Sequence, residues 1–105
     1  FQHHSFFLIR PDEPDQYYNL PIASRRTLLD ALEQAGVRHV FAGHYHRNAL
    51  GRDGPLEMVT SGPVGKPLGT DPSGVRIVLV TASGVSHRYY ALDSIPGQIV
   101  LPRSP

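Results

Sequence analysis

The chain has 105 residues, of which 40% are apolar, and its formal net charge at pH 7 is +1. This size suits one small domain, and the arginines form no basic run of the kind that follows a nucleic acid backbone. No apolar stretch approaches the roughly 18 residues of a membrane-spanning helix, and the absence of cysteine excludes disulfides and thiolate metal sites. We therefore expect neither a nucleic acid nor a membrane partner.

The first residues predict the end of a strand and then a polar loop. Phe1-Gln2-His3-His4 is typical of a strand end, and because the chain does not begin with Met we expect it to be a piece of a longer protein. Residues 6–9 are apolar, and the prolines that follow predict a loop. Asp12, Glu13 and Asp15 in that loop resemble a ligand cluster, but a solvated loop is the favoured interpretation.

A helix is predicted over residues 24–35, with Ser24 as its N-cap and Gly36 at the C′ position. One face of this helix carries Leu28, Leu29, Leu32 and Ala35. Residues 37–42 then predict a short buried strand. Strand end, helix and strand make a βαβ unit, so the two strands should be parallel and the crossover right-handed.

Two histidines follow this buried strand directly, in Gly43-His44-Tyr45-His46. Because both strands of a βαβ unit point the same way, His3 should emerge on the same sheet edge as His44 and His46. Imidazole is the commonest metal-binding side chain, and two histidines two residues apart can serve two adjacent metals. The pattern thus favours His3, His44 and His46 as metal ligands, although a polar turn after a strand is the alternative for the last two.

Neighbouring residues offer other interpretations. His4 is a rival to His3 as ligand, but we expect it to turn to the opposite side, as alternate residues of a strand do. We expect His39 and His87 to be structural. Arg47 and Asn48 either support a ligand histidine, meet substrate or serve the turn.

The second half of the chain predicts a β-meander. We expect a turn at residues 51–55, a strand at 56–60, a glycine-rich loop at 61–65, a turn at 71–74, and a hairpin of strands 75–80 and 85–91 around residues 82–84. The loop over residues 62–69 lacks the ending of a nucleotide-binding loop and is expected near the mouth of the site. Residues 95–105 have no periodicity, which predicts an irregular tail.

Several of these motifs resemble the calcineurin-like metallophosphoesterase superfamily. Gly43-His44-Tyr45-His46 resembles its final GHxH motif, and Phe1-Gln2-His3 resembles the isolated histidine motif that precedes it. Met58-Val59-Thr60-Ser61 and His87-Arg88-Tyr89-Tyr90 resemble the branch that contains serine/threonine protein phosphatases. The similarity runs from residue 1 to residue 94.

The resemblance implies an α/β fold, namely the C-terminal half of a two-sheet metallophosphoesterase sandwich, with residues 1–94 in the domain and 95–105 as the tail. It also implies that His3 and His44 bind one metal ion and His46 the other, with His44 and His46 catalytic. The two ions would be Mn, Fe or Zn. The family's other ligands come from DxH, GDxxD and GNHE motifs, none of which occurs in this sequence, so a missing N-terminal half should supply them.

The function implied is hydrolysis of phosphate monoesters, with phosphoserine or phosphothreonine proteins as candidate substrates, by a metal-activated water at a dinuclear centre. The isolated chain is expected to be inactive, and a cytoplasmic location is expected for the protein. The alternative is a catalytically silent fragment that binds a metal ion or a partner.

Overall fold

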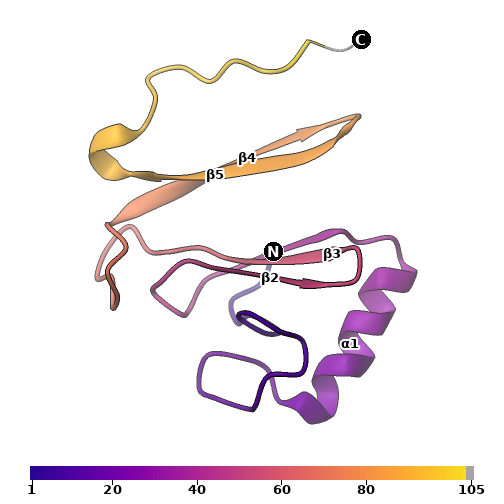
Figure 1. Cartoon of the computed structure of the whole chain (residues 1–105). Coiled ribbons are helices and arrows are strands. Elements are labelled where there is room, and N and C mark those ends of the chain that lie inside the picture. The colour runs from indigo at the N-terminus through magenta and orange to yellow at the C-terminus, as the bar shows by residue number, and fades with distance from the viewer. Residues whose placement is uncertain (104–105) are drawn as a thin grey trace.

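The computed structural model describes residues 1–103, and residues 104–105 at the end of the predicted tail lie outside the described residues. The described chain forms helix α1 (Ile22–Gln34) and strands β1 (His39–Ala42), β2 (Ala49–Asp53), β3 (Leu56–Thr60), β4 (Gly74–Thr81) and β5 (Gly84–Ala91), followed by the short 3-10 helix η1 (Leu92–Ser94) (Figure 1). The predicted α/β class is confirmed. Within residues 1–103, no helix is both long enough and apolar enough to cross a membrane.

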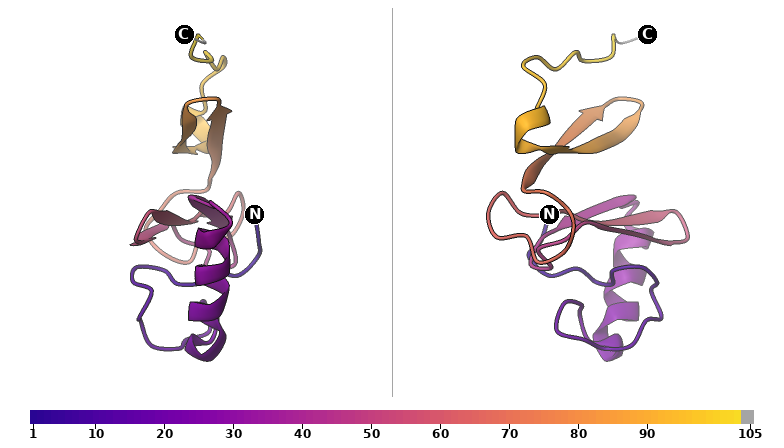
Figure 2. Two further views of the ribbon diagram at one scale, coloured as in Figure 1. Left: turned by 90° about the vertical axis from the view of Figure 1, so that its right-hand side faces the viewer. Right: turned by 60° about the vertical axis from the view of Figure 1, so that its left-hand side comes forward.

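The strands form two small sheets. The first has the order β1-β3-β2, in which β1 and β3 are parallel and β2 and β3 are antiparallel. The second is the predicted hairpin β4-β5, whose register pairs Thr81 with Gly84 across a two-residue turn, so that Gly84 belongs to β5 and not to the turn as predicted. Helix α1 and the hairpin lie on opposite sides of the first sheet, which makes three layers (Figure 2).

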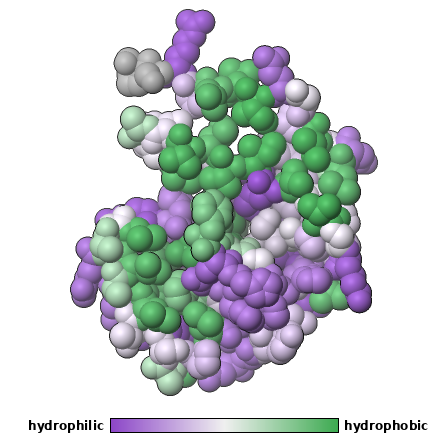
Figure 3. Space-filling view, turned by 180° about the vertical axis from the view of Figure 1, so that it is seen from behind, coloured by the Kyte–Doolittle hydropathy of each residue, from purple (hydrophilic) through white to green (hydrophobic). Residues whose placement is uncertain are grey.

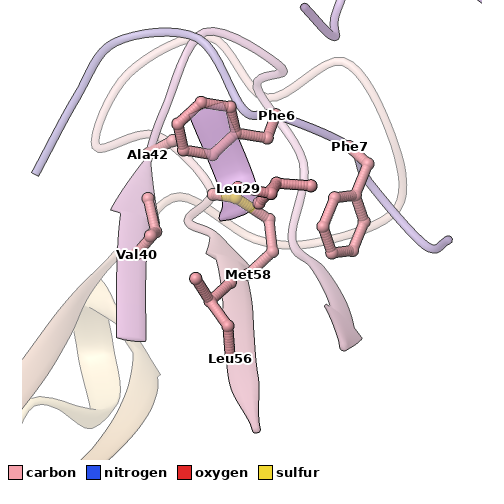
Figure 4. Close-up of a cluster of buried hydrophobic side chains, with 7 residues drawn as sticks. All are labelled: Phe6, Phe7, Leu29, Val40, Ala42, Leu56 and Met58. Carbon is pink, nitrogen blue, oxygen red and sulfur yellow. The ribbon is translucent and has the colours of Figure 1, made fainter. Parts of the chain in front are cut away.

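The hydrophobic core lies between α1 and the first sheet (Figure 4). Alternate residues of a strand point to opposite faces, so β1 and β3 each direct two apolar side chains towards the helix. The buried cluster consists of Phe6, Phe7, Leu29, Val40, Ala42, Leu56 and Met58. Full burial of a side chain of this size contributes about 1.5–3 kcal/mol, so this cluster supplies much of the stability of the chain.

Helix α1 begins two residues before the predicted start. Ser24 is not the N-cap: Pro21 occupies that position, and the Ile22 N–H donates to Asp15 Oδ1 at 2.6 Å. Proline suits a helix start because its fixed φ is compatible with entry into the helix and its missing N–H is not needed there. Gly36 has φ 85° and follows the last helical residues, which confirms its C′ position.

The face of α1 that packs on the core also differs from the prediction. Leu29 is buried and Leu32 is partly buried, but Leu28 is 43% exposed. The buried position one turn before Leu29 is taken by Arg25, which is only 1% exposed. A stripe of positions 25, 29 and 32 therefore faces inward.

The N-terminal segment lies beside β1 without forming a strand in the described chain. The Gln2 N–H donates to the Phe41 carbonyl at 3.0 Å, and the Gly43 N–H donates to the His3 carbonyl at 3.1 Å. These two bonds place the first residues along β1, where the sequence predicted a strand end. The parallel partner that β1 has in the described residues is β3.

The predicted turn at residues 51–55 is wrong in part. Residues 51–53 belong to β2, whose whole length pairs with β3, and only Gly54 and Pro55 form the turn. Gly54 has φ 54°, the left-handed conformation that a two-residue hairpin turn requires. Residues 95–103 contain no helix or strand, as expected for the tail.

Apolar side chains between the first sheet and the hairpin are not fully covered. A cavity of about 430 Å³ lies there, lined in part by Phe1, Phe41, Val78 and Val80. Seen from behind, the molecule shows apolar residues gathered over the hairpin and the tail (Figure 3). The described chain thus leaves an apolar surface beside β1.

Candidate metal centre

Three histidines converge at the end of β1. One ring nitrogen from each of His3, His4 and His44 lies within 4.8 Å of those of the other two. His3 Nε2 is 3.1 Å from His44 Nδ1, although 41 positions separate the two residues in the chain. The structure therefore brings together two of the three predicted ligands, His3 and His44, and adds His4.

The expected orientation of His4 is wrong. Its ring centroid lies 4.0 Å from that of His44, on the same side as His3. The reason is that the backbone bends at His3 and His4 instead of continuing as a strand, so the alternation of sides does not apply. Desolvation, and then the charges of His44 and His3, lower the pKa of His4 below its ordinary value, which favours the neutral ring that binds a metal.

The loop after β1 holds its histidines in an unusual backbone conformation. His44 has φ 64° and His46 has φ 58°, both in the left-handed region that side chains other than glycine rarely adopt. Such strained residues cluster at functional sites, where the surrounding structure compensates for their cost. Two backbone hydrogen bonds hold the loop. The Tyr45 N–H donates to the Gly43 carbonyl at 2.7 Å, and the Gly43 N–H donates to the His3 carbonyl at 3.1 Å.

His44 has a ring nitrogen that is free to bind a metal ion. Its Nε2 is buried and has no hydrogen-bond partner among the described residues. A buried polar atom without a partner costs about 1–3 kcal/mol, so such atoms are rare in native proteins. A nitrogen-rich donor set with one unpaired buried nitrogen suits Zn, Fe or Mn better than Ca.

His46 lies outside the cluster of three histidines. Its Nδ1 is 2.9 Å from the carbonyl oxygen of Lys66, and its own carbonyl accepts from the Leu68 N–H at 3.1 Å. A carbonyl oxygen can only accept, so Nδ1 carries the proton and Nε2 is left with a free lone pair. Histidines that bind metals commonly hold their second ring nitrogen in this way.

A buried carboxylate fixes the loop that faces the cluster. Glu13 was expected in a solvated loop, but it is only 7% exposed. Its oxygens accept from the backbone N–H groups of Leu8, Ile9 and Arg10 at 3.0, 2.8 and 3.0 Å, and from Asn19 Nδ2 at 2.8 Å. Burial raises the pKa of Glu13, but these four donors outweigh burial and hold it below its ordinary value.

A buried guanidinium fixes the same loop from the helix side. Arg25 donates to the carbonyl oxygens of Leu20, Pro11 and Glu13, with the shortest of these bonds, to Glu13, at 2.6 Å. A buried charge is tolerated when its donors are paired in this way, and Arg25 Nη2 also lies 3.6 Å from Asp15 Oδ1. Glu13 and Arg25 together make residues 11–20 a rigid neighbour of the histidines.

That loop places aromatic rings against the cluster. The ring of Tyr17 lies 4.9 Å from that of His44, and Tyr18 contacts both His44 and Tyr45, at 5.8 and 4.9 Å between centroids. The Arg47 guanidinium lies over the rings of Tyr45 and Tyr18, at 4.8 and 5.7 Å. We call Tyr17, Tyr18, Tyr45 and Arg47 the tyrosine wall. The sequence patterns described above did not single out these residues of the loop as part of the site.

Most of this chain is similar in sequence to known proteins. The chain is 50% identical over 95 residues to serine/threonine-protein phosphatase CPPED1 of Danio rerio, and 51% identical over 96 residues to that of Homo sapiens. The resemblance to calcineurin-like phosphoesterases is confirmed. Each match covers 90% of this chain but only 31% of the relative, so the chain spans about a third of the length of these CPPED1 phosphatases. No family model and no solved structure matches the chain.

In this relative of CPPED1, Asn48 ties the histidine loop to the loop that follows β3 and to β4. Its Oδ1 accepts from the Gly62 N–H at 2.9 Å and from Arg76 Nη2 at 2.8 Å. Its own N–H donates to Asp71 Oδ2 at 2.9 Å. The structure therefore gives Asn48 a scaffolding role two residues after His46.

His87 has the structural role that its position predicted. Arginine can only donate, so Arg76 Nη1 donates to His87 Nδ1 at 2.9 Å, and His87 Nε2–H donates to Glu57 Oε1 at 2.5 Å. This chain of bonds joins β3 to the hairpin. His39 stacks on Phe41, with 6.3 Å between ring centroids, and lies outside the histidine cluster.

Proposed function

We propose that this chain is the histidine-bearing part of a metal-dependent phosphoesterase that hydrolyses phosphate monoesters, phosphoserine and phosphothreonine in proteins among them. The observation that carries the proposal is the meeting of His3 with His44, whose Nε2 is buried and unpaired, in a chain half identical to CPPED1 phosphatases. A cytoplasmic location stays a prediction.

The proposed ligand assignment gives His3 and His44 to one metal ion and His46 to a second. The contact between His46 Nδ1 and the Lys66 carbonyl supports this assignment because it leaves Nε2 free to bind. The chemistry that such a pair of ions would supply, when bound, is a water of lowered pKa and neutralisation of the charge on the phosphoryl oxygens. The chain's own part is to hold these imidazoles in place through the strained loop and the bonds of Asn48.

The remaining ligands would come from an N-terminal half that this sequence does not include. Two observations support such a half: the chain spans about a third of its CPPED1 relatives, and an apolar cavity of about 430 Å³ lies open beside β1. Packing of further chain against Phe1, Phe41 and Val78 would bury that surface.

A second candidate function rests on the position of His4. His3, His4 and His44 form a three-nitrogen set without His46, and such a set can hold a single ion. A chain with only that site would be a metal-binding module without phosphatase activity.

Turnover measurements separate the two. We expect the complete protein with added Mn²⁺ to release phosphate from a phosphoserine peptide, and the 105-residue chain alone to show negligible turnover. His44→Ala and His46→Ala in the complete protein should each lose more than the roughly 10–100-fold that removal of a mere supporting residue costs. His39→Ala is the matched control, since its ring lies outside the cluster, and it should keep its activity.

Two results would refute the proposal. Full activity in His44→Ala or His46→Ala would remove these residues from the site. Robust turnover by the 105-residue chain, lost on His44→Ala, would show that the described residues assemble a complete site and that no second half is needed.

A further inference from the structure

The tyrosine wall is a surface beside the histidine cluster for which the proposed phosphate chemistry has no use. Tyr17 is 77% exposed, so its ring contributes little to the core. It nevertheless lies 4.9 Å from the ring of His44, in contact with a proposed metal ligand. An exposed aromatic side chain at this place is available to a bound molecule rather than to the fold.

The wall is preorganised. Tyr17 and Tyr18 stand on the loop that Glu13 and Arg25 fix from inside, and the Gln16 N–H donates to Asn19 Oδ1 at 3.0 Å to close the turn between them. Rings held in place before binding lose little conformational entropy when a partner packs against them. The fixed position of its rings therefore makes the tyrosine wall suited to binding a partner.

Arg47 adds a cation with unused donors. Its guanidinium lies over the rings of Tyr45 and Tyr18, and its hydrogen bond within the described residues is a long one, 3.4 Å from Nη2 to the Leu68 carbonyl. A guanidinium has five N–H donors, so most of them remain for oxygen acceptors of a ligand. Tyrosine and arginine are also the residues enriched where proteins bind peptides and proteins tightly.

We propose that the tyrosine wall binds the peptide chain that carries the phosphorylated residue, so that Tyr17 and Arg47 select phosphopeptides over small phosphate esters. Tyr17 packs on the peptide, and Arg47 donates to peptide oxygens. This inference rests on the proposed function, because it places the phosphate at the histidines, one of which, His44, has its ring 4.9 Å from that of Tyr17.

The test compares two substrates that share one phosphate group, a phosphoserine peptide and free O-phosphoserine, in the complete protein. We expect Tyr17→Ala and Arg47→Ala to lower kcat/KM for the peptide about tenfold and to leave free O-phosphoserine within about twofold, whereas Tyr17→Phe keeps the peptide rate. Arg88→Ala is the matched control, because Arg88 makes a similar contact over Tyr90, at 5.1 Å, on the hairpin. An equal loss on both substrates, or no loss on either, would overturn the proposal.

A binding assay separates this inference from the proposed function. Fluorescence anisotropy of a labelled phosphoserine peptide reports binding whether or not turnover occurs. The protein could bind the peptide without turnover, and Tyr17→Ala could weaken that binding about tenfold. This result would refute the phosphatase function and support peptide binding by the tyrosine wall. If the protein turns over substrate and its peptide affinity is unchanged by Tyr17→Ala and Arg47→Ala, the phosphatase function is supported and peptide binding by the tyrosine wall is refuted. If the wild-type protein binds no peptide, the proposal that the tyrosine wall binds the peptide is refuted.

Discussion

Glu13→Ala tests whether a buried carboxylate holds the loop that faces the histidines. The change removes the acceptor of four hydrogen bonds, three from backbone N–H groups and one from Asn19. A hydrogen bond to a charged group is worth about 1.5–3 kcal/mol, and a buried donor left unpaired costs about 1–3 kcal/mol. The four bonds share one carboxylate and some freed donors can reach water, so we expect a loss of about 3–5 kcal/mol in the free energy of unfolding.

Urea unfolding followed by circular dichroism measures this loss. Glu13→Gln should lose less than Glu13→Ala, because its one oxygen still accepts two bonds while its amide group faces two donors. Asp12→Ala is the control: the Asp12 side chain is 81% exposed and, within residues 1–103, pairs only with Arg10 at 3.7 Å, so its removal should change stability by less than about 0.5 kcal/mol. A Glu13→Ala protein as stable as Asp12→Ala would refute the reasoning.

The same residue gives a pH dependence with a definite sign. The folded pKa of Glu13 lies below its ordinary value. Its contribution is therefore fully present above the unfolded pKa, about 4.3, and is lost as the pH falls through the lower folded pKa. The stability difference between the wild type and Glu13→Gln should shrink below about pH 4. A difference that stays constant down to pH 2 would contradict this account.

Two further substitutions test the fold and the support of the site. Gly51→Ala would place Cβ 2.5 Å from the Ile9 carbonyl oxygen and 2.7 Å from Phe7 Cε2, so we expect a loss of about 1–3 kcal/mol in thermal or urea unfolding. A Cβ at Gly65 meets nothing within 4 Å, so Gly65→Ala should not change stability. Equal unfolding midpoints for Gly51→Ala and Gly65→Ala would contradict this reasoning. Asn48→Ala removes the oxygen that accepts two hydrogen bonds. It should weaken Mn²⁺ binding about tenfold, measured by calorimetry. An unchanged affinity would show that the histidine loop does not need Asn48 to keep its conformation.

Much of the fold could be predicted because local patterns decide it. The hairpin β4-β5 follows from alternating residues around a short turn, and the end of α1 follows from Gly36. Strand β2 could not be predicted in the same way. Gly51 and the residues after it are typical of a turn, and their strand conformation comes from pairing along the whole of β3 and from the close approach of Phe7.

The site could be predicted where it depends on strand direction. His3 and His44 meet because the N-terminal segment lies along β1, as the βαβ reasoning required. His4 lies beside them because the backbone bends at His3 and His4, and no pattern in the sequence predicts this bend. Glu13 and Arg25 are charged residues that sequence reasoning places at the surface, and only the fold brings together the donors and carbonyls that make their burial stable.

The assignment of the histidines to two metal ions is the central claim, and anomalous diffraction from Mn²⁺-loaded crystals of the complete protein tests it most directly. We expect two anomalous peaks, one bonded to His3 and His44 and the other to His46, whose Nδ1 should still contact the Lys66 carbonyl. A single peak held by His3, His4 and His44, with His46 bound to no metal, would contradict it.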